Sequence, residues 1–346
     1  MNAIGPGRWT LKLFCSVLLS ALAAGALLWA AEGPSAGQNL PPFDFEITRV
    51  TRLLVLAPHP DDEALGAAGL IARVRARGGA VQVVLLTSGD GFPEAVEAAR
   101  GITNPKPSDY RGFGLRREQE TRTAMAALGV PSSRITFLGF PDEGLCLLAS
   151  TYLFDKRRSF ESPYTDRVRP PPTEQLVRGA KYRGIDVRRE LERTVTDFAP
   201  TLIVLPHPED DHPDHCSTHI FAREALEAVR TLRSPRLRVL HYLVHFGQWP
   251  LTADVTDSRQ LTPPEDFPAA EGRWVSLALT PEEAAARQRA ILTYQSQVQV
   301  IGRFMRAFAR DNELYLEGEP ASLPECWCDG QNVATELPPS RYRRRP

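Results

Sequence analysis

Two short segments of this chain combine imidazole and carboxylate side chains of the kind that bind a transition metal. Residues 59–63 read His-Pro-Asp-Asp-Glu, and residues 207–215 read His-Pro-Glu-Asp-Asp-His-Pro-Asp-His. Each segment directly follows a run of β-branched and leucine residues, which predicts a buried strand. Because ligands in open α/β sheets bind beyond the carboxyl ends of strands, we expect the two segments to form the halves of one metal site.

The spacing of these residues predicts a zinc site with three protein ligands. A catalytic zinc ion usually keeps a fourth position for water, whose pKa it lowers to about 7. His59 and Asp62 are three residues apart across a predicted strand-to-helix turn, so both can reach one ion. His215, at the predicted start of a helix after the other strand, supplies the third ligand. We therefore expect Zn²⁺ as the cofactor.

Three neighbouring residues predict the catalytic roles that a hydrolase needs. Asp61 is adjacent to a ligand without being needed as one, so it can act as the general base toward water and later return the proton to the leaving group. His212 can stabilise the oxyanion or protonate the leaving amine. Asp214 is placed to orient one of the two imidazoles.

Simpler interpretations exist for parts of these segments. Taken alone, residues 59–63 can cap the helix that follows. Residues 209–211 are interpreted as a solvated acidic turn. His219 is expected to pack or to support a ligand, and His207 is a less favoured ligand than His215. The occurrence of both segments, each after a strand, favours the metal site.

The hydrophobic pattern predicts strands and helices in alternation. We expect strands at 52–57, 81–87, 135–138 and 201–205, and helices at 63–77, 117–128, 187–198, 215–231 and 281–309. Alternation of this kind implies βαβ units and a mainly parallel sheet covered on both faces. The predicted fold class is therefore α/β, a Rossmann-like three-layer domain.

The predicted catalytic domain spans residues 46–320, after a Gly, Pro and Ser-rich linker at 32–45, and a tail at 321–346 follows it. Insertions at about 146–184 and 251–272 interrupt the alternation. Long irregular segments often form lids or binding loops. Because the first insertion follows the strand that ends near residue 138, we interpret it as a substrate-side loop.

An uncharged run of 19 residues, 13–31, follows Arg8 and Lys12 near the start of the chain. As a helix it is about 28 Å long, close to the thickness of a bilayer core. Residues 1–31 are therefore predicted to be an N-terminal membrane anchor or a cleaved signal peptide. Both alternatives place the domain outside the cytoplasm, either membrane-anchored or secreted, because the positive flank stays inside.

The charge and the cysteines restrict the partners and leave the redox state open. A net charge of −1 provides no concentrated basic surface, so no nucleic-acid partner is expected. The expected partners are small-molecule or glycan substrates, and a membrane that residues 13–31 contact. In an oxidising compartment, Cys146, Cys216, Cys326 and Cys328 are either free or disulfide-bonded.

The chain resembles the PIG-L/LmbE-like zinc de-N-acetylases over about residues 50–315. Six motifs carry the resemblance: Ala57 to Glu63 with Gly66, Thr87 to Gly91, Arg117 and Glu120 leading to Ala127 to Val130, Gly139 to Asp142, His212 to His215, and Tyr294 to Gln297. The last motif often has His at its aromatic position. The two insertions also depart from the compact members, and we expect them to remodel the walls of the substrate-binding site that determine specificity.

The resemblance implies that His59, Asp62 and His215 bind zinc, that Asp61 is the general base and that His212 stabilises the oxyanion. It also implies a reaction in which an N-acetyl group is removed from a glucosamine-like sugar, releasing acetate and a free amine. The identity of the sugar does not follow from these motifs.

The sequence thus predicts a zinc-dependent amidohydrolase that acts on an N-acetyl amino sugar in a glycan, glycolipid or glycoconjugate. The alternative is a non-catalytic glycan-binding protein that keeps the fold. That alternative is disfavoured because a binding module has no need of Asp61 and His212. Metal-dependent acyl or phosphoester hydrolysis is a third interpretation, which fits less well without a second set of bridging carboxylates.

Overall fold

The computed structural model describes residues 40–152, 157–230, 237–251, 259–268 and 272–318. The predicted anchor or signal peptide and the predicted tail lie outside these residues. Among the helices in the described ranges, none has both the length and the apolar composition needed to cross a bilayer.

A seven-stranded mixed sheet, in the order β3-β2-β1-β4-β5-β7-β6, forms the centre of the fold. Its first five strands are parallel, and β7 and β6 extend the β5 edge in antiparallel pairing. The strands are β1 (Arg52–Ala57), β2 (Ala80–Thr87), β3 (Ile135–Phe140), β4 (Leu202–Pro206), β5 (Arg238–Tyr242), β6 (Arg273–Ala278) and β7 (Asn312–Glu317). The predicted α/β fold and mainly parallel sheet are confirmed; β5, β6 and β7 were not predicted.

The parallel strands are apolar on both faces because each face carries its own core. In β1, Leu53 and Val55 belong to one buried cluster, while Leu54 and Leu56 belong to another. Successive side chains of a strand point to opposite faces of the sheet. An uninterrupted apolar run is therefore what a doubly covered strand requires.

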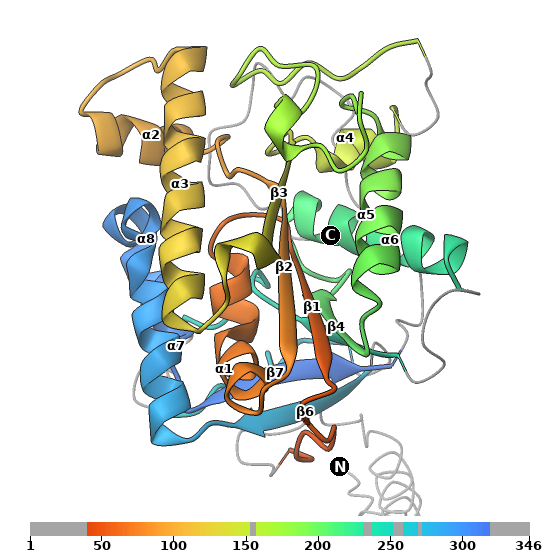
Figure 1. Cartoon of the computed structure of the whole chain (residues 1–346). Helices are drawn as coiled ribbons and strands as arrows, with labels where there is room; N and C mark the ends of the chain where they lie inside the picture. Colours follow the sequence, from red (N-terminus) through yellow and green to blue (C-terminus); the bar gives the residue numbers. More distant parts are fainter. Residues whose placement is uncertain (1–39, 153–156, 231–236, 252–258, 269–271, 319–346) are drawn as a thin grey trace, which may run out of the picture. The chain divides into compact units, whose positions relative to one another are not determined.

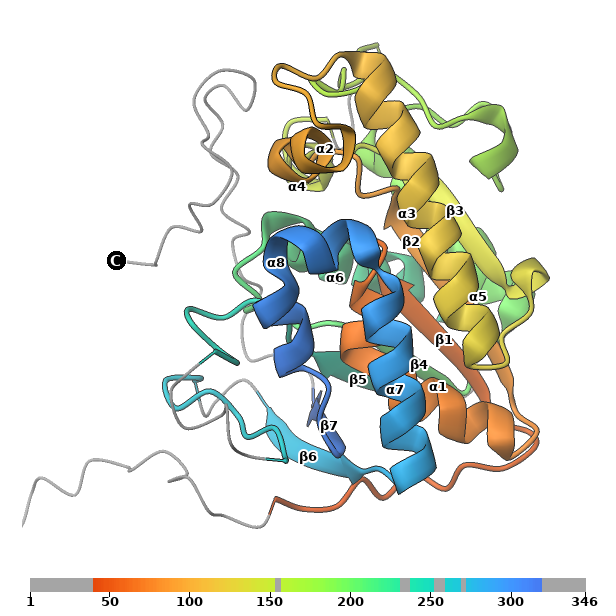
Figure 2. The same cartoon turned by 90° about the vertical axis from the view of Figure 1, so that its left-hand side faces the viewer.

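Helices cover both faces of the sheet. In Figure 1, α1, α3, α7 and α8 lie on one side of the strands and α4, α5 and α6 on the other, and Figure 2 shows α3, α7 and α8 in front of them. The helices are α1 (Asp62–Ala76), α2 (Pro93–Arg100), α3 (Pro107–Ala127), α4 (Leu145–Ala149), α5 (Gly184–Phe198), α6 (Pro213–Ala228), α7 (Pro281–Thr293) and α8 (Gln295–Ala307).

Two helices differ from the prediction in their boundaries. Helix α3 begins ten residues before the predicted start, at Pro107, whose fixed φ suits the first helical position. The predicted helix at 281–309 is two helices, because Tyr294 has φ −77° and ψ 66° and interrupts the helical backbone. This break makes Tyr294 the junction of α7 and α8.

The sheet order places a topological switch point between β1 and β4. From β1 the chain continues to β2 on one side, and β4 pairs with β1 on the other. In open α/β sheets the crevice at such a point is where ligands bind. The loops that follow β1 and β4 carry residues 59–63 and 207–215, so both sequence segments lie at this crevice.

The last strand is tied to the first helix through Glu313. Its carboxylate accepts hydrogen bonds from the backbone N–H groups of Gly69 (2.6 Å) and Leu70 (2.8 Å) in α1. A Cβ on Gly69 would lie 3.1 Å from the Glu313 carboxyl carbon and 2.5 Å from Leu279, so only glycine permits this approach. Glu313 is 1% exposed, and Arg287 Nε lies 3.4 Å from it.

In the residues of the first insertion that the structure describes, 146–152 and 157–184, the chain is irregular apart from α4, a short 3₁₀ turn, Pro172–Glu174, and the start of α5 at Gly184. Cys146 in α4 and Cys216 in α6 are disulfide-bonded, and the two helices pack against each other. Cys216 directly follows His215. The two described cysteines are therefore oxidised, next to the predicted metal site.

Candidate metal centre

Local hydrogen bonds hold the imidazole and carboxylate residues at the junction of β1 and α1. The backbone N–H of His59 donates to Asp62 Oδ2 (3.0 Å), and the backbone N–H of Asp61 donates to Glu63 Oε2 (3.0 Å). Asp61 has φ 126°, a conformation that favours glycine and that costs a non-glycine residue about 1–3 kcal/mol. The loop is therefore strained at Asp61 and held by its neighbours.

The β4–α6 loop ends in a helix cap made by a histidine. The backbone N–H of Asp214 donates to His212 Nδ1 (3.2 Å), which places His212 at the N-cap of α6. Pro213 occupies the first helical position, where a missing N–H has no cost. His215 comes one turn into the helix and is 0% exposed. The cap thus fixes His212 and His215 relative to each other.

The structure brings His59, Asp62 and His215 together as a possible ligand set. Asp62 Oδ2 lies 3.2 Å from His59 Nδ1 and 3.2 Å from His215 Nε2. Ligand atoms about 2.0–2.1 Å from one tetrahedral zinc ion are about 3.3 Å apart. His215 Nε2 is also buried without a hydrogen bond of acceptable geometry. These residues therefore fit a zinc ion.

A second possible set, His59, His212 and Asp214, fits a metal ion less well. Both oxygens of Asp214 already accept backbone N–H groups, from Glu143 (2.8 Å) and Leu145 (3.0 Å). His212 Nδ1 is engaged in the helix cap. These hydrogen bonds compete with metal binding by Asp214 and His212, whereas His215 Nε2 has no such hydrogen bond.

Carboxylates face the remaining nitrogen of each ligand imidazole. His59 Nε2 lies 3.1 Å from Asp142 Oδ1 and 3.3 Å from Asp214 Oδ2. His215 Nδ1 lies 3.2 Å from Asp210 Oδ2. Such carboxylates fix the tautomer and the ring orientation of metal-binding histidines. The orienting role predicted for Asp214 is directed at His59.

The interpretation of residues 209–211 as a solvated turn is wrong for Glu209, which is 7% exposed, and for Asp210. Asp210 is 4% exposed, and its Oδ2 accepts the backbone N–H groups of Val244 (2.8 Å) and His245 (3.0 Å). The loop after β5 provides these donors. Their hydrogen bonds replace those that water would make to the buried carboxylate.

These carboxylates change the titration of the imidazoles in the metal-free protein. Burial alone lowers the pKa of His215, but Asp210 and Asp62 outweigh burial and raise that pKa to about 9. Burial likewise opposes a higher pKa at His59, where Asp142 and its neighbours raise the pKa well above the usual value. A divalent cation competes with these protons, so metal binding is expected to release them.

Asp61 faces an arginine that is fixed from two sides. Arg117 Nη2 lies 3.2 Å from Asp61 Oδ2 and donates to Pro60 O (2.5 Å), while Arg117 Nη1 donates to Gly89 O (2.8 Å). Burial raises the pKa of Asp61 to about 8 against the opposing charge of Arg117. A cation at the adjacent ligand set would lower that pKa and favour the carboxylate form of a general base.

His212 presents a donor on its outward side. Because Nδ1 accepts the Asp214 N–H, the neutral ring carries its proton on Nε2. Nε2 lies 3.5 Å from Glu143 Oε1, a distance too long for a good hydrogen bond. The neutral ring therefore carries a donor at Nε2, which is the kind of group that stabilises an oxyanion.

Three residues near the candidate ligands were not predicted as site residues. Asp142 and Asp210 contact the imidazoles of His59 and His215, and His245 lies with its ring centroid 5.3 Å from His212 and 5.0 Å from His215. His245 is three residues after β5, so recognition of that strand was the signal that could have found it.

Three other histidines form a separate group, the histidine trio, made by His207, His219 and His241. The His241 ring centroid lies 5.5 Å from that of His207 and 5.1 Å from that of His219. None of the three belongs to either possible ligand set within the described residues. This placement agrees with the prediction that His219 is not a fourth ligand. It also agrees with the preference for His215 over His207 as a ligand, because His215 lies in the candidate site and His207 does not.

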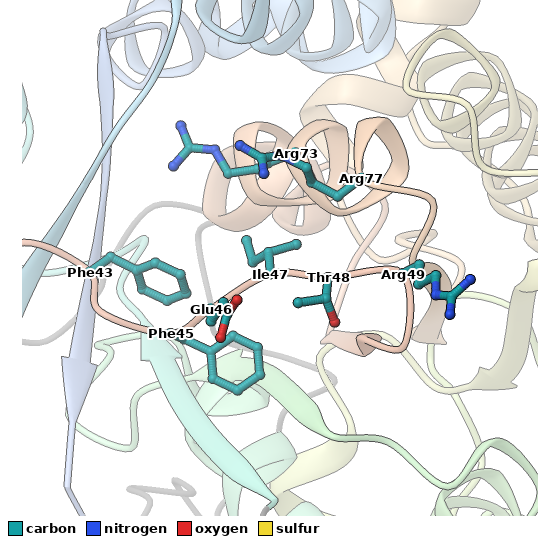
Figure 3. A pocket seen from close by; sticks show the side chains of 8 residues that line it. All are labelled: Phe43, Phe45, Glu46, Ile47, Thr48, Arg49, Arg73 and Arg77. Atoms are coloured by element: carbon teal, nitrogen blue, oxygen red, sulfur yellow. The ribbon is translucent and has the colours of Figure 1, made fainter.

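A pocket of about 600 Å³ lies away from the metal site (Figure 3). Residues 43–49 line one wall, and Arg73 and Arg77 of α1 line another. Arg73 is eleven residues beyond Asp62 on the same helix, about 16 Å along its axis. The pocket is thus separate from the candidate metal centre.

Fold and site together define an α/β protein with a His-Asp-His metal site at the switch point of its sheet. The sequence model described as GlcNAc-PI de-N-acetylase, of the PIG-L family, matches residues 54–226, which is 173 of 346 residues. The chain therefore belongs to the PIG-L family. The matched range contains both metal-site loops.

Curated relatives share this region. A 1D-myo-inositol 2-acetamido-2-deoxy-alpha-D-glucopyranoside deacetylase 1 of Saccharopolyspora erythraea is 30% identical over 202 residues, covering 56% of this chain and 58% of the relative. The deacetylase of the same description from Corynebacterium diphtheriae is 40% identical over 163 residues, covering 46% and 47%. A probable N-acetyl-alpha-D-glucosaminyl L-malate deacetylase 2 of Bacillus anthracis is 26% identical over 184 residues, covering 53% and 62%. The chain spans about half the length of these relatives.

Solved structures of similar fold are more distant in sequence. An N,N'-diacetylchitobiose deacetylase from Pyrococcus horikoshii is 17% identical with a TM-score of 0.48, covering 78% of this chain and 86% of that one. The 4-carboxy-2-hydroxymuconate hydratase GalB from Pseudomonas putida is 14% identical with a TM-score of 0.46, covering 75% and 83%. Neither likeness bears on what this chain acts on.

Proposed function

We propose that this protein is a zinc-dependent de-N-acetylase that removes the acetyl group from an N-acetyl amino sugar. The observation that carries the proposal is the arrangement of His59, Asp62 and His215, with Asp61 and His212 beside them. Membership of the PIG-L family and the deacetylase names of the curated relatives support the same reaction.

The residues have separate roles in this reaction. His59, Asp62 and His215 would hold Zn²⁺, which would supply Lewis-acid chemistry at the amide carbonyl. Asp61, oriented by Arg117, takes the proton of the attacking water and returns a proton to the leaving amine. His212 donates its Nε2–H to the oxyanion. Products are acetate and the free amino sugar.

The proposal is tested with purified protein and a panel of N-acetyl sugars. Metal content is measured by mass spectrometry, and amine release is measured for N-acetylglucosamine, its glycosides and its glycolipids, with simple N-acetyl amino acids as a control. About one zinc per chain and amine release from a sugar are expected. Sugar binding without amine release would favour the alternative of a non-catalytic glycan-binding protein.

We also propose that the domain acts outside the cytoplasm, anchored or released through residues 1–31. The uncharged run after Arg8 and Lys12 supports this location, as does the disulfide-bonded state of Cys146 and Cys216, because disulfides persist in oxidising compartments. A fusion of residues 1–45 to a reporter that is active only after export should be active. An inactive fusion that stays in the cytoplasm would contradict this location.

A further inference from the structure

The first insertion brings a tyrosine to the border of the metal site. A Cβ on Gly91 would lie 3.0 Å from the ring of Tyr164 and 3.2 Å from Asp142 Cβ, so Tyr164 and Asp142 flank this glycine. Gly91 N–H donates to Asp142 Oδ2 (2.5 Å), and Asp142 Oδ1 lies 3.1 Å from His59 Nε2. Two residues, Gly91 and Asp142, therefore connect Tyr164 with the imidazole of His59.

The position of Tyr164 is fixed by the turn that carries it. Ser162 N–H donates to Arg167 O (2.9 Å), and Arg111 Nη1 of α3 donates to Thr165 O (2.8 Å). The Tyr164 ring packs on Tyr110 of α3 with a centroid distance of 5.3 Å. The insertion is thus attached to α3, and its tyrosine is held beside the site.

The hydroxyl of Tyr164 has no hydrogen-bond partner among the residues that the structure describes, although the ring is well packed. Burial and the nearby carboxylates of Glu143, Asp142 and Asp214 raise the pKa of Tyr164. The hydroxyl therefore remains protonated at neutral pH. Because the Tyr164 ring lies against Gly91, whose N–H is bonded to Asp142, this hydrogen-bond donor belongs to the same corner of the site as Asp142 and the adjacent Glu143.

Glu143 is held next to the same place in a sparsely populated conformation. Its φ is 59°, and its backbone N–H donates to Asp214 Oδ2 (2.8 Å). Non-glycine residues at positive φ cluster at functional sites because surrounding contacts must hold them there. Its side chain is 36% exposed, with Oε1 3.5 Å from His212 Nε2. The carboxylate is thus accessible beside the proposed oxyanion donor.

We propose that Tyr164 and Glu143 form a hydroxyl-binding subsite for the sugar ring next to its N-acetyl group. A sugar hydroxyl both donates and accepts hydrogen bonds. The phenol O–H donates to one hydroxyl, and the Glu143 carboxylate accepts from the same or the adjacent one. This inference rests on the proposed function. It assigns to Tyr164 of the first insertion the selection of a polyhydroxylated substrate over a simple N-acetyl amine.

The test compares Tyr164→Phe and Glu143→Gln with wild type in steady-state kinetics. The substrates are N-acetylglucosamine and its 3-, 4- and 6-deoxy analogues. Loss of one neutral hydrogen bond should raise KM about 2- to 10-fold, and weakening of the bond to the carboxylate should raise it more. The penalty should disappear for the deoxy analogue that lacks the contacted hydroxyl. If both residues bind one hydroxyl, the rise in KM of the double variant should be smaller than the product of the rises in the two single variants.

The matched control is Tyr110→Phe, which removes a hydroxyl from the tyrosine packed on Tyr164. Equal KM values for Tyr164→Phe, Tyr110→Phe and wild type across the deoxy series would overturn the subsite and leave the de-N-acetylase proposal intact. Zinc content and thermal midpoint, expected to match wild type, exclude misfolding as the cause of any loss.

A binding measurement separates the two proposals if wild type releases no amine. Calorimetric titration of the zinc-loaded protein with N-acetylglucosamine should then still detect binding that Tyr164→Phe weakens and Tyr110→Phe does not. That outcome would reject the reaction and retain the subsite. Absence of sugar binding by wild type would reject both.

Discussion

Every one of the seven histidines lies with its ring centroid within 5.5 Å of another histidine ring, yet they form two groups that differ in whether carboxylates face the imidazoles. The site group consists of His59, His212, His215 and His245; the histidine trio consists of His207, His219 and His241. In the site group, His59 and His215 face carboxylates. In the trio, His219 and His241 form no ion pair within the described part of the chain.

The surroundings reverse the sign of the pKa shift between the two imidazoles that face carboxylates, His59 and His215, and the imidazoles of the trio; in His245 of the site group, burial lowers the pKa to about 3 as well. Asp210 and Asp62 raise the pKa of His215 to about 9, whereas burial lowers the pKa of His219 to about 3 and that of His241 well below the usual value. The comparison teaches that buried imidazoles form a candidate metal centre under two conditions. A carboxylate must lie beside the ring nitrogens that would bind the metal, and another carboxylate must face the second nitrogen of each ring. Clustering of histidines is insufficient.

The largest expected difference between the groups is in metal binding. His215→Ala and Asp62→Ala should each lose nearly all bound zinc, because three protein ligands are the minimum of a catalytic site. His241→Asn should retain about one zinc per chain. Metal content after gel filtration measures this difference. Loss of zinc from His241→Asn alone would place the metal in the trio instead.

Asp61→Asn should keep the metal and lose activity by about 10²- to 10⁴-fold in kcat, because the amide cannot accept the proton of water. Asp211→Asn, at an acidic residue whose carboxylate accepts Gly247 N–H, is the control. Amine release from the preferred sugar measures the effect. A kcat for Asp61→Asn within a few-fold of wild type would reduce Asp61 to a helix-terminal residue.

Asp210→Asn should weaken zinc binding by about 10- to 100-fold, since it removes the charge that faces His215 Nδ1. Competition with a zinc-binding dye measures the dissociation constant. Asp211→Asn again serves as the neighbouring control. Equal affinity in the Asp210 and Asp211 variants would show that the Asp210 charge does not support the ligand.

The smallest effect concerns the pH dependence of stability, which His219 should influence in the direction set by its lowered pKa. Below about pH 6.5 the unfolded chain protonates this histidine while the folded protein does not, until pH falls to about 3. Folding stability is therefore lost as pH falls through this window, by up to about 1.4 kcal/mol per pH unit. His219→Gln should make the slope of unfolding free energy between pH 6 and pH 4 shallower. Denaturant titration at each pH would refute this if the two slopes were equal.

The sequence was sufficient for the two loops of the site because their residue types and their positions after apolar strands are local features. Asp210 was misjudged because the donors that bury it, Val244 and His245, belong to a loop more than 30 residues away. Asp142 was recognised only as part of a motif, since its contact with His59 spans two strands of the sheet. The three strands β5, β6 and β7 were missed as short segments in a region without clear alternation.

The tie between Glu313 and the helix that begins with Asp62 has a consequence for the order of events during synthesis. The backbone N–H of Gly69 in α1 donates a hydrogen bond to a side chain that lies 244 residues later in the chain. At about 5–20 residues per second, a ribosome needs roughly 12–50 s to make that stretch. During this interval the first half of the site exists without the strand that secures its helix. The N–H groups of Gly69 and Leu70 therefore acquire their carboxylate partner only after β7 has been made.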